Sequence, residues 1–160
     1  MKTHDEYQEN SNVCFSAIVN QTQSLLYYEV FSILHDQSKT EEIMKIVFDK
    51  IACNMNILQS IDVQHIRLIV LILGRAALMD NYGHEQVDAY MIQKRAITSS
   101  SLSNPVAKVI DELPTKYRDI IMLKSFFNEK QISTLLGKKY LIVHKDIQIA
   151  KQLIKRNISK

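Results

Sequence analysis

Residues 113–156, LPTKYRDIIMLKSFFNEKQISTLLGKKYLIVHKDIQIAKQLIKR, decide the fold that we expect for this chain. A short amphipathic segment, QISTLL, is followed by Gly137 and then by a longer segment whose apolar residues Val143, Ile147, Ala150 and Ile154 recur at helical spacing. A helix, a glycine turn and a second, basic helix are typical of a helix-turn-helix, in which the second helix lies in the major groove of DNA. Two ordinary core helices joined by a glycine turn would give the same pattern, and this alternative stays open.

The composition favours an all-α fold. The 160 residues include only three glycines and two prolines, too few for the many tight turns of a β-rich protein. Apolar and polar residues do not alternate at period two over any useful length. We therefore predict an all-α chain, folded as two small helical domains.

The distribution of charge and of small polar residues indicates where the two domains meet. The net charge is +3, yet residues 1–95 carry eight Lys/Arg against twelve Asp/Glu (−4), whereas residues 96–160 carry twelve against five (+7). The sign changes at ITSSSLSN, residues 97–104, whose Ser, Thr and Asn content is typical of a linker. We predict one domain over 1–95, a linker over 96–104 and a basic, phosphate-binding domain over 105–160.

Local signals predict the individual helices. Residues 1–12 lack apolar periodicity and are expected to form a frayed tail, and helices are expected over 13–34, 38–57 and 62–82, followed by a weaker one over 84–95. A capping box of Ser38 and Glu41 should start the second helix, and Gly83 should end the third. In the C-terminal domain, Asn104 and Pro105 should open a short helix, and Pro114 should precede the next. The expected core includes Val30, Phe31, Ile43, Val47, Ile69 and Leu73.

The N-terminal sequence and the cysteines indicate a cytoplasmic protein. MKTHDEYQEN is polar and acidic, which argues against a secretory signal. The most apolar run, 66–73, is interrupted by Arg67 and is too short to span a bilayer, so no membrane insertion is expected. Cys14 and Cys53 have neither metal-ligand spacing nor the density of a disulfide framework, and we predict two buried thiols.

The last predicted helix carries the residues expected to contact DNA. Lys138, Lys139 and Tyr140 lie at its N-terminal end, where backbone N–H groups favour phosphate. His144, Lys145 and Gln148 lie away from the apolar stripe and could reach base edges. Lys151 lies further along the helix and is expected to contact the DNA backbone, or to be a favourable charge near a helix C-terminus. A solvated basic face is the alternative.

No enzyme site emerges from the sequence. The five histidines are scattered, no histidine pair has the helical spacing of a metal site, and no glycine-rich phosphate loop is present. We therefore expect no catalytic residue, no metal ligand and no cofactor.

The order of these segments resembles that of the extracytoplasmic-function alternative sigma factors of bacterial RNA polymerase. ELPTKYRDIIMLKSFF (112–127) is similar to the opening of the family's fourth region, and QISTLLG with the helix after it is similar to that region's helix-turn-helix. FSAIVNQTQSLLYYEVFSILHDQSKTEEIMKIVFDKI (15–51) resembles the first two helices of the second region. LGRAALMDNY (73–82) resembles its third-helix motif and places Arg75 and Asp80 on two family positions.

The resemblance implies a transcription initiation factor. Its second region would bind core RNA polymerase and melt promoter DNA, and its fourth region would read promoter DNA. Glu41, Glu42, Lys45 and Asp49 would dock on the polymerase clamp, although ordinary solvated charges would look the same. Separately from the resemblance, Arg67 and Arg75 lie eight positions apart on one predicted helix and could bind nucleic-acid phosphates, with an internal ion pair of Arg75 with Asp80 as the alternative. An anti-sigma factor is a further partner that the resemblance allows.

Two other functions fit the sequence. One is a sigma-like protein-interaction regulator that has lost promoter opening, suggested by the acidic N-terminal half and by Ile69, where the family commonly has an aromatic residue. The other is a stand-alone DNA-binding regulator that uses only the C-terminal helices.

Overall fold

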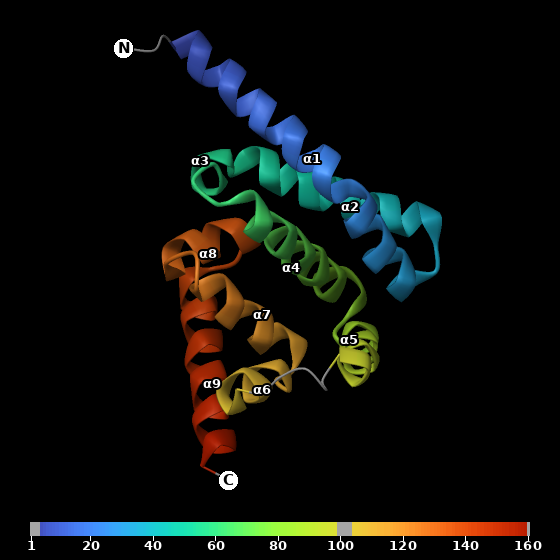
Figure 1. The fold of residues 1–160 in the computed structure, drawn as a ribbon, viewed down its shortest axis with the longest axis vertical. Helices are drawn as coiled ribbons and strands as arrows, with labels where there is room; N and C mark the ends of the chain where they lie inside the picture. The colour runs from blue at the N-terminus through green and yellow to red at the C-terminus, as the bar shows by residue number, and fades with distance from the viewer. Residues whose placement is uncertain (1–3, 99–103, 160) are drawn as a thin grey trace. The chain divides into compact units, whose positions relative to one another are not determined.

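The described residues form helices throughout. The computed structural model describes residues 4–98 and 104–159, and within them the chain forms nine α-helices and no strand (Figure 1). This confirms the predicted all-α class. The chain divides into two compact units, Met1–Ala77 and Leu78–Lys160. That division lies before the predicted boundary at 96–104, and because 99–103 fall outside the described residues, the predicted linker stays a prediction.

The first unit is built from α1 (His4–Leu34), α2 (Gln37–Cys53), α3 (Met55–Leu58) and the first part of α4 (Val63–Tyr82). The predicted core residues Val30, Ile43, Val47, Ile69 and Leu73 are all buried, whereas Phe31 is exposed, which corrects its assignment to the core. Helices α1 and α4 approach closely at Gly74, where an added Cβ would lie 2.6 Å from Cδ1 of Leu26. The absence of a side chain at Gly74 therefore lets these two helices pack together.

Three predicted helix ends in the first unit were wrong. Helix α1 already begins at His4, inside the segment that we expected to be a frayed tail. Helix α2 is capped by Asp36, whose carboxylate accepts a hydrogen bond of 2.9 Å from the Lys39 N–H, so Ser38 lies inside the helix and forms no capping box. The expected 38–57 helix is divided at Asn54, whose side chain donates to the Lys50 carbonyl at 2.7 Å.

The second unit contains the rest of α4, then α5 (Glu85–Thr98), α6 (Pro105–Asp111), α7 (Thr115–Lys124), α8 (Glu129–Leu136) and α9 (Tyr140–Ile158). Helix α9 packs against α6, α7 and α8 (Figure 1). Of its predicted stripe, Val143, Ile147 and Ala150 are fully buried, whereas Ile154 is only half-buried. Asn104 caps α6 as predicted, because its side chain accepts a hydrogen bond of 2.9 Å from the Val106 N–H.

The turn between α8 and α9 requires a left-handed residue. Gly137 has φ +64° and ends α8, and nothing lies within 4 Å of a Cβ built on it. A side chain at this position therefore meets no neighbour. A substitution of Gly137 would lower the stability only through the strain of the left-handed backbone conformation.

Replacing Gly137 with alanine is expected to lower the free energy of unfolding by about 1 kcal/mol. Gly137→Asn should cost less, because asparagine tolerates the left-handed conformation better than alanine does. Chemical denaturation of the two variants checks this. Equal losses for Ala and Asn would show that the conformation of residue 137 is not what limits the substitution.

Candidate nucleic-acid interface

The ends of α8 fix how α9 is presented. The Asn128 side chain accepts a hydrogen bond of 2.8 Å from the Gln131 N–H, and the Gln131 side chain accepts one of 3.0 Å from the Asn128 N–H. At the other end, the Ser133 hydroxyl donates to the Lys138 carbonyl across the turn. Helix α8 is thus capped at both ends, and the chain enters α9 in a defined direction.

The exposed side of α9 carries most of the predicted DNA contacts. We call this surface the basic face of α9; it comprises Lys139, Tyr140, His144, Lys145, Gln148, Lys151 and Lys155, all of which are exposed. Asp146, the only acidic residue of the helix, is buried and lies 3.2 Å from the Lys116 ammonium on α7. The basic face therefore contains no carboxylate contributed by α9 itself.

Glu129, at the start of α8, holds two residues of the basic face. One oxygen of its carboxylate, Oε2, lies 3.0 Å from the Tyr140 hydroxyl and 2.8 Å from Nδ1 of His144. The two rings stack with centroids 6.1 Å apart. The hydrogen bond from His144, reinforced by that from Tyr140, lowers the pKa of Glu129, and the same carboxylate raises the pKa of Tyr140. Glu129 was not among the predicted site residues, because nothing in the sequence shows that it meets a side chain 15 positions away.

The lowered pKa of Glu129 predicts a pH dependence of stability. Since the folded-state pKa lies below the unfolded value of about 4.3, the ionised carboxylate stabilises the fold at pH values above that value. This contribution is lost as the pH falls through the folded-state pKa. We expect the stability difference between the wild-type chain and Glu129→Gln to shrink as the pH falls below about 4.3.

Urea denaturation across this range measures the effect, with Glu112→Gln as a control that removes an exposed carboxylate elsewhere in the same unit. A difference that persisted undiminished to pH 3 would contradict the assignment of the stabilising charge to Glu129.

Lys138 is less available for a phosphate contact than the lysines that follow it. Its ammonium lies 3.4 Å from the Asp80 carboxylate at the end of α4, and its side chain is half-buried. The charge of Lys138 is therefore already partly neutralised.

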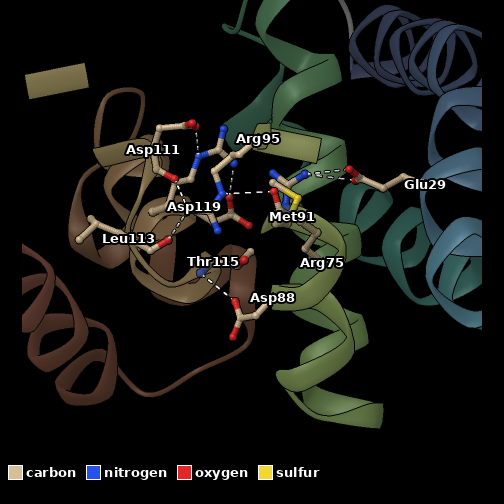
Figure 2. Close-up of polar contacts among 10 residues, drawn as sticks. Glu29, Arg75, Asp88, Met91, Arg95, Asp111, Leu113, Thr115 and Asp119 are labelled. Carbon is tan, nitrogen blue, oxygen red and sulfur yellow. Dashed lines mark hydrogen bonds and ion pairs between the residues drawn. The ribbon is translucent and has the colours of Figure 1, made fainter. Parts of the chain in front are cut away.

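Arg75, predicted to contact nucleic-acid phosphates, is buried in an ion pair, a placement that does not fit a phosphate contact. The guanidinium is buried, and Nη1 lies 3.2 and 3.1 Å from the two carboxylate oxygens of Glu29 on α1 (Figure 2). The alternative was an internal ion pair between Arg75 and Asp80. Arg75 does form an internal ion pair, but its partner is Glu29, and Asp80 instead contacts Lys138. A buried guanidinium bonded to a carboxylate is not available to a phosphate.

Helix α5 secures the first turn of α7, a role that no local sequence signal predicts. The Asp88 carboxylate accepts a hydrogen bond of 3.0 Å from the Thr115 N–H, and Arg95 donates to the carbonyls of Asp111 and Leu113 (Figure 2). These contacts satisfy backbone groups at the end of α6 and at the start of α7, which would otherwise lack helical partners.

The predicted polymerase-binding residues lie together on α2. Glu41, Glu42, Lys45 and Asp49 are all exposed, and Lys45 lies 2.9 Å from Asp49, which raises the pKa of that lysine. Beside them, a groove of about 460 Å³ is lined by Gln23, Ser24, Tyr27, Tyr28, Phe31 and Met44. The sequence pattern did not predict that Phe31 lines a surface groove, because it indicated a core position for this residue.

Three further expectations concern the cysteines, metal ligands and membrane-spanning helices. Cys53 is exposed, which corrects the prediction of a buried thiol, and the side chain of Cys14 lies outside the described residues. In the described part of the chain, no three His, Cys, Asp or Glu side chains are placed to hold a metal ion. Among the same residues, no helix combines the length and apolarity needed to cross a membrane.

A scan against protein-family models finds no match to this chain, and a search of the curated proteins finds none either.

Proposed function

We propose that the chain binds double-stranded DNA by placing the basic face of α9 in the major groove. The observation that carries this proposal is the separation of charge on α9, with its single carboxylate buried against Lys116 and its lysines exposed. An α-helix fits the major groove, and lysines along it neutralise phosphates on either side. Gln148 lies on the same face and has the amide that pairs with adenine.

The start of α9 supports the same orientation. Lys139 is its N-cap residue and makes no side-chain capping bond, so the Lys139 side chain does not compete with an external acceptor for the first N–H groups of the helix. A phosphate there would meet both these N–H groups and the positive end of the helix dipole.

We propose further that DNA binding serves transcription initiation. The resemblance of both halves to alternative sigma factors supports this role, in which residues 13–95 bind core RNA polymerase and residues 105–156 select the promoter. The exposed charges of α2, Glu41, Glu42, Lys45 and Asp49, are the proposed docking surface. Phosphate contacts would position the factor on DNA, and a few base contacts would specify the site.

The second candidate is a sigma-like regulator that binds its partner without opening promoters. One observation favours it: Arg75 and Ile69, which lie on α4, the helix that includes the resemblance to the family's third-helix motif, are both buried in the first unit. Buried side chains cannot contact an unwound strand. A stand-alone DNA-binding regulator is the third candidate.

Selection from a pool of randomised duplexes tests the DNA-binding proposal. The full chain is immobilised, with and without purified core RNA polymerase, and the retained duplexes are sequenced. Enrichment of a defined motif is expected. A motif obtained without polymerase and unaffected by it would favour the stand-alone regulator, and no motif under either condition would overturn the proposal.

A further inference from the structure

The contact between Glu129 and the basic face of α9 has a specific geometry. A single carboxylate oxygen is shared by the Tyr140 hydroxyl and the His144 ring, which come from two successive turns of α9. The Glu129 side chain is only 15% exposed, whereas that of His144 is 48% exposed. The Glu129 side chain is thus more buried than the His144 ring that it contacts.

Holding α8 and α9 together does not require this contact. The two helices already pack through fully buried side chains, including Ile132 and Leu135 on α8 and Val143 and Ile147 on α9. A carboxylate close to a phosphate-binding surface also repels DNA. The contact of Glu129 with two proposed DNA-binding residues, Tyr140 and His144, is therefore better explained by its effect on those two side chains.

The hydrogen bond fixes where the His144 ring carries its proton. An ionised carboxylate can only accept, so Nδ1 of His144 must be the donor. In the neutral ring, Nε2 then has a free lone pair and is an acceptor. Nε2 lies on the opposite side of the imidazole from Nδ1, and it has no hydrogen-bond partner among the described residues.

We propose that Glu129 is a positioning residue for DNA recognition, which fixes His144 as the Nδ1–H tautomer so that Nε2 accepts a hydrogen bond from a base. This inference rests on the proposed binding of DNA by α9. In the major groove, the groups that donate such a bond are the exocyclic amines, N6 of adenine and N4 of cytosine. Guanine and thymine present acceptors at the corresponding edge and would be rejected.

Nitrogen-15 NMR of the free protein tests the first step without DNA. Long-range proton–nitrogen spectra of the imidazole distinguish the two neutral tautomers from the imidazolium. The wild-type chain should show His144 with the proton on Nδ1 at a pH where the ring is neutral, and Glu129→Gln should shift the population towards Nε2–H. A wild-type ring protonated on Nε2 alone would overturn the proposal.

Selection from randomised duplexes tests the second step, with the wild-type chain, Glu129→Gln, His144→Ala and the double variant. We expect one motif position restricted to adenine or cytosine in the wild type. Its preference should fall about tenfold in each single variant, and the double variant should be no worse, because Glu129 acts through His144. Glu112→Gln, the matched charge control, should keep the preference.

The outcomes separate this inference from the function on which it rests. A motif that His144→Ala degrades but Glu129→Gln leaves intact would overturn the role of Glu129 and leave DNA binding by α9 standing. A wild-type chain that enriches no motif would overturn both. Because Glu129→Gln removes a negative charge, its affinity for random DNA should stay the same or rise, whereas a variant that simply misfolded would lose it.

Discussion

Replacing Arg75 with alanine is expected to lower the free energy of unfolding by about 3–5 kcal/mol. The guanidinium of Arg75 and the carboxylate of Glu29 belong to residues that are each only 3% exposed, and they join α4 to α1. Removing the guanidinium takes from the buried Glu29 carboxylate the positive charge and the hydrogen bonds that Arg75 Nη1 supplies to it. A buried charge without its counter-charge costs far more than the loss of an exposed ion pair.

Chemical denaturation measures this loss, and two variants make the result interpretable. Arg67→Ala removes an exposed arginine from the same helix and should change the free energy of unfolding by less than about 0.5 kcal/mol. The double change Glu29→Leu with Arg75→Met should recover much of the stability, because apolar residues of similar volume can replace a buried ion pair. A loss below about 1 kcal/mol for Arg75→Ala would contradict the buried pair and would reopen a role for Arg75 at the surface.

Changing Lys139, Lys145 and Lys151 together to alanine is expected to weaken DNA binding by about ten- to a hundredfold at about 0.1 M salt. The salt dependence is the sharper signal. Each lysine that neutralises a phosphate should account for about 0.9 of the slope of log affinity against log salt, so the slope of the triple variant should be smaller by about 2.7. All three lysines are exposed on the basic face of α9, so their removal should leave the fold intact.

The control for this experiment is the triple variant of Lys39, Lys45 and Lys50 on α2, which changes the net charge by the same amount in the other unit. It should keep both the affinity and the slope of the wild-type chain. Equal losses of affinity for the two triple variants would mean that net charge, and not the basic face, governs binding.

Local signals in the sequence were enough to predict most of the helices. Asn104 and Pro105 open α6, Gly83 follows α4, and Gly137 separates α8 from α9, because each residue has a backbone or capping preference that acts within a few positions. The start of α2 shows the limit of such reasoning. Asp36 and Ser38 are both good capping residues, and the extended backbone at Asp36 lets its carboxylate take the role.

Long-range contacts account for what the sequence could not predict at the candidate site. Arg75 and Glu29 are 46 residues apart, and no periodicity relates them. The contacts of Glu129 with Tyr140 and His144 depend on how α8 packs against α9, and periodicity does not specify this angle. The exposed face of α9 was predictable because it is the complement of the apolar stripe at Val143, Ile147 and Ala150.

The two halves of the proposed function rest on different observations. DNA binding is supported by the exposed lysines and by the burial of Asp146 within the second unit. Polymerase binding is supported by the resemblance and by the exposed charges on α2. An experiment that requires both at once is therefore the strongest test.

That experiment is in vitro transcription with purified core RNA polymerase and templates that carry the selected DNA motif. We predict transcripts with one defined 5′ end that appear only when the chain is added, and that disappear with the Lys139, Lys145 and Lys151 triple variant. A chain that binds both the polymerase and the motif but yields no defined transcript would contradict the proposed initiation function.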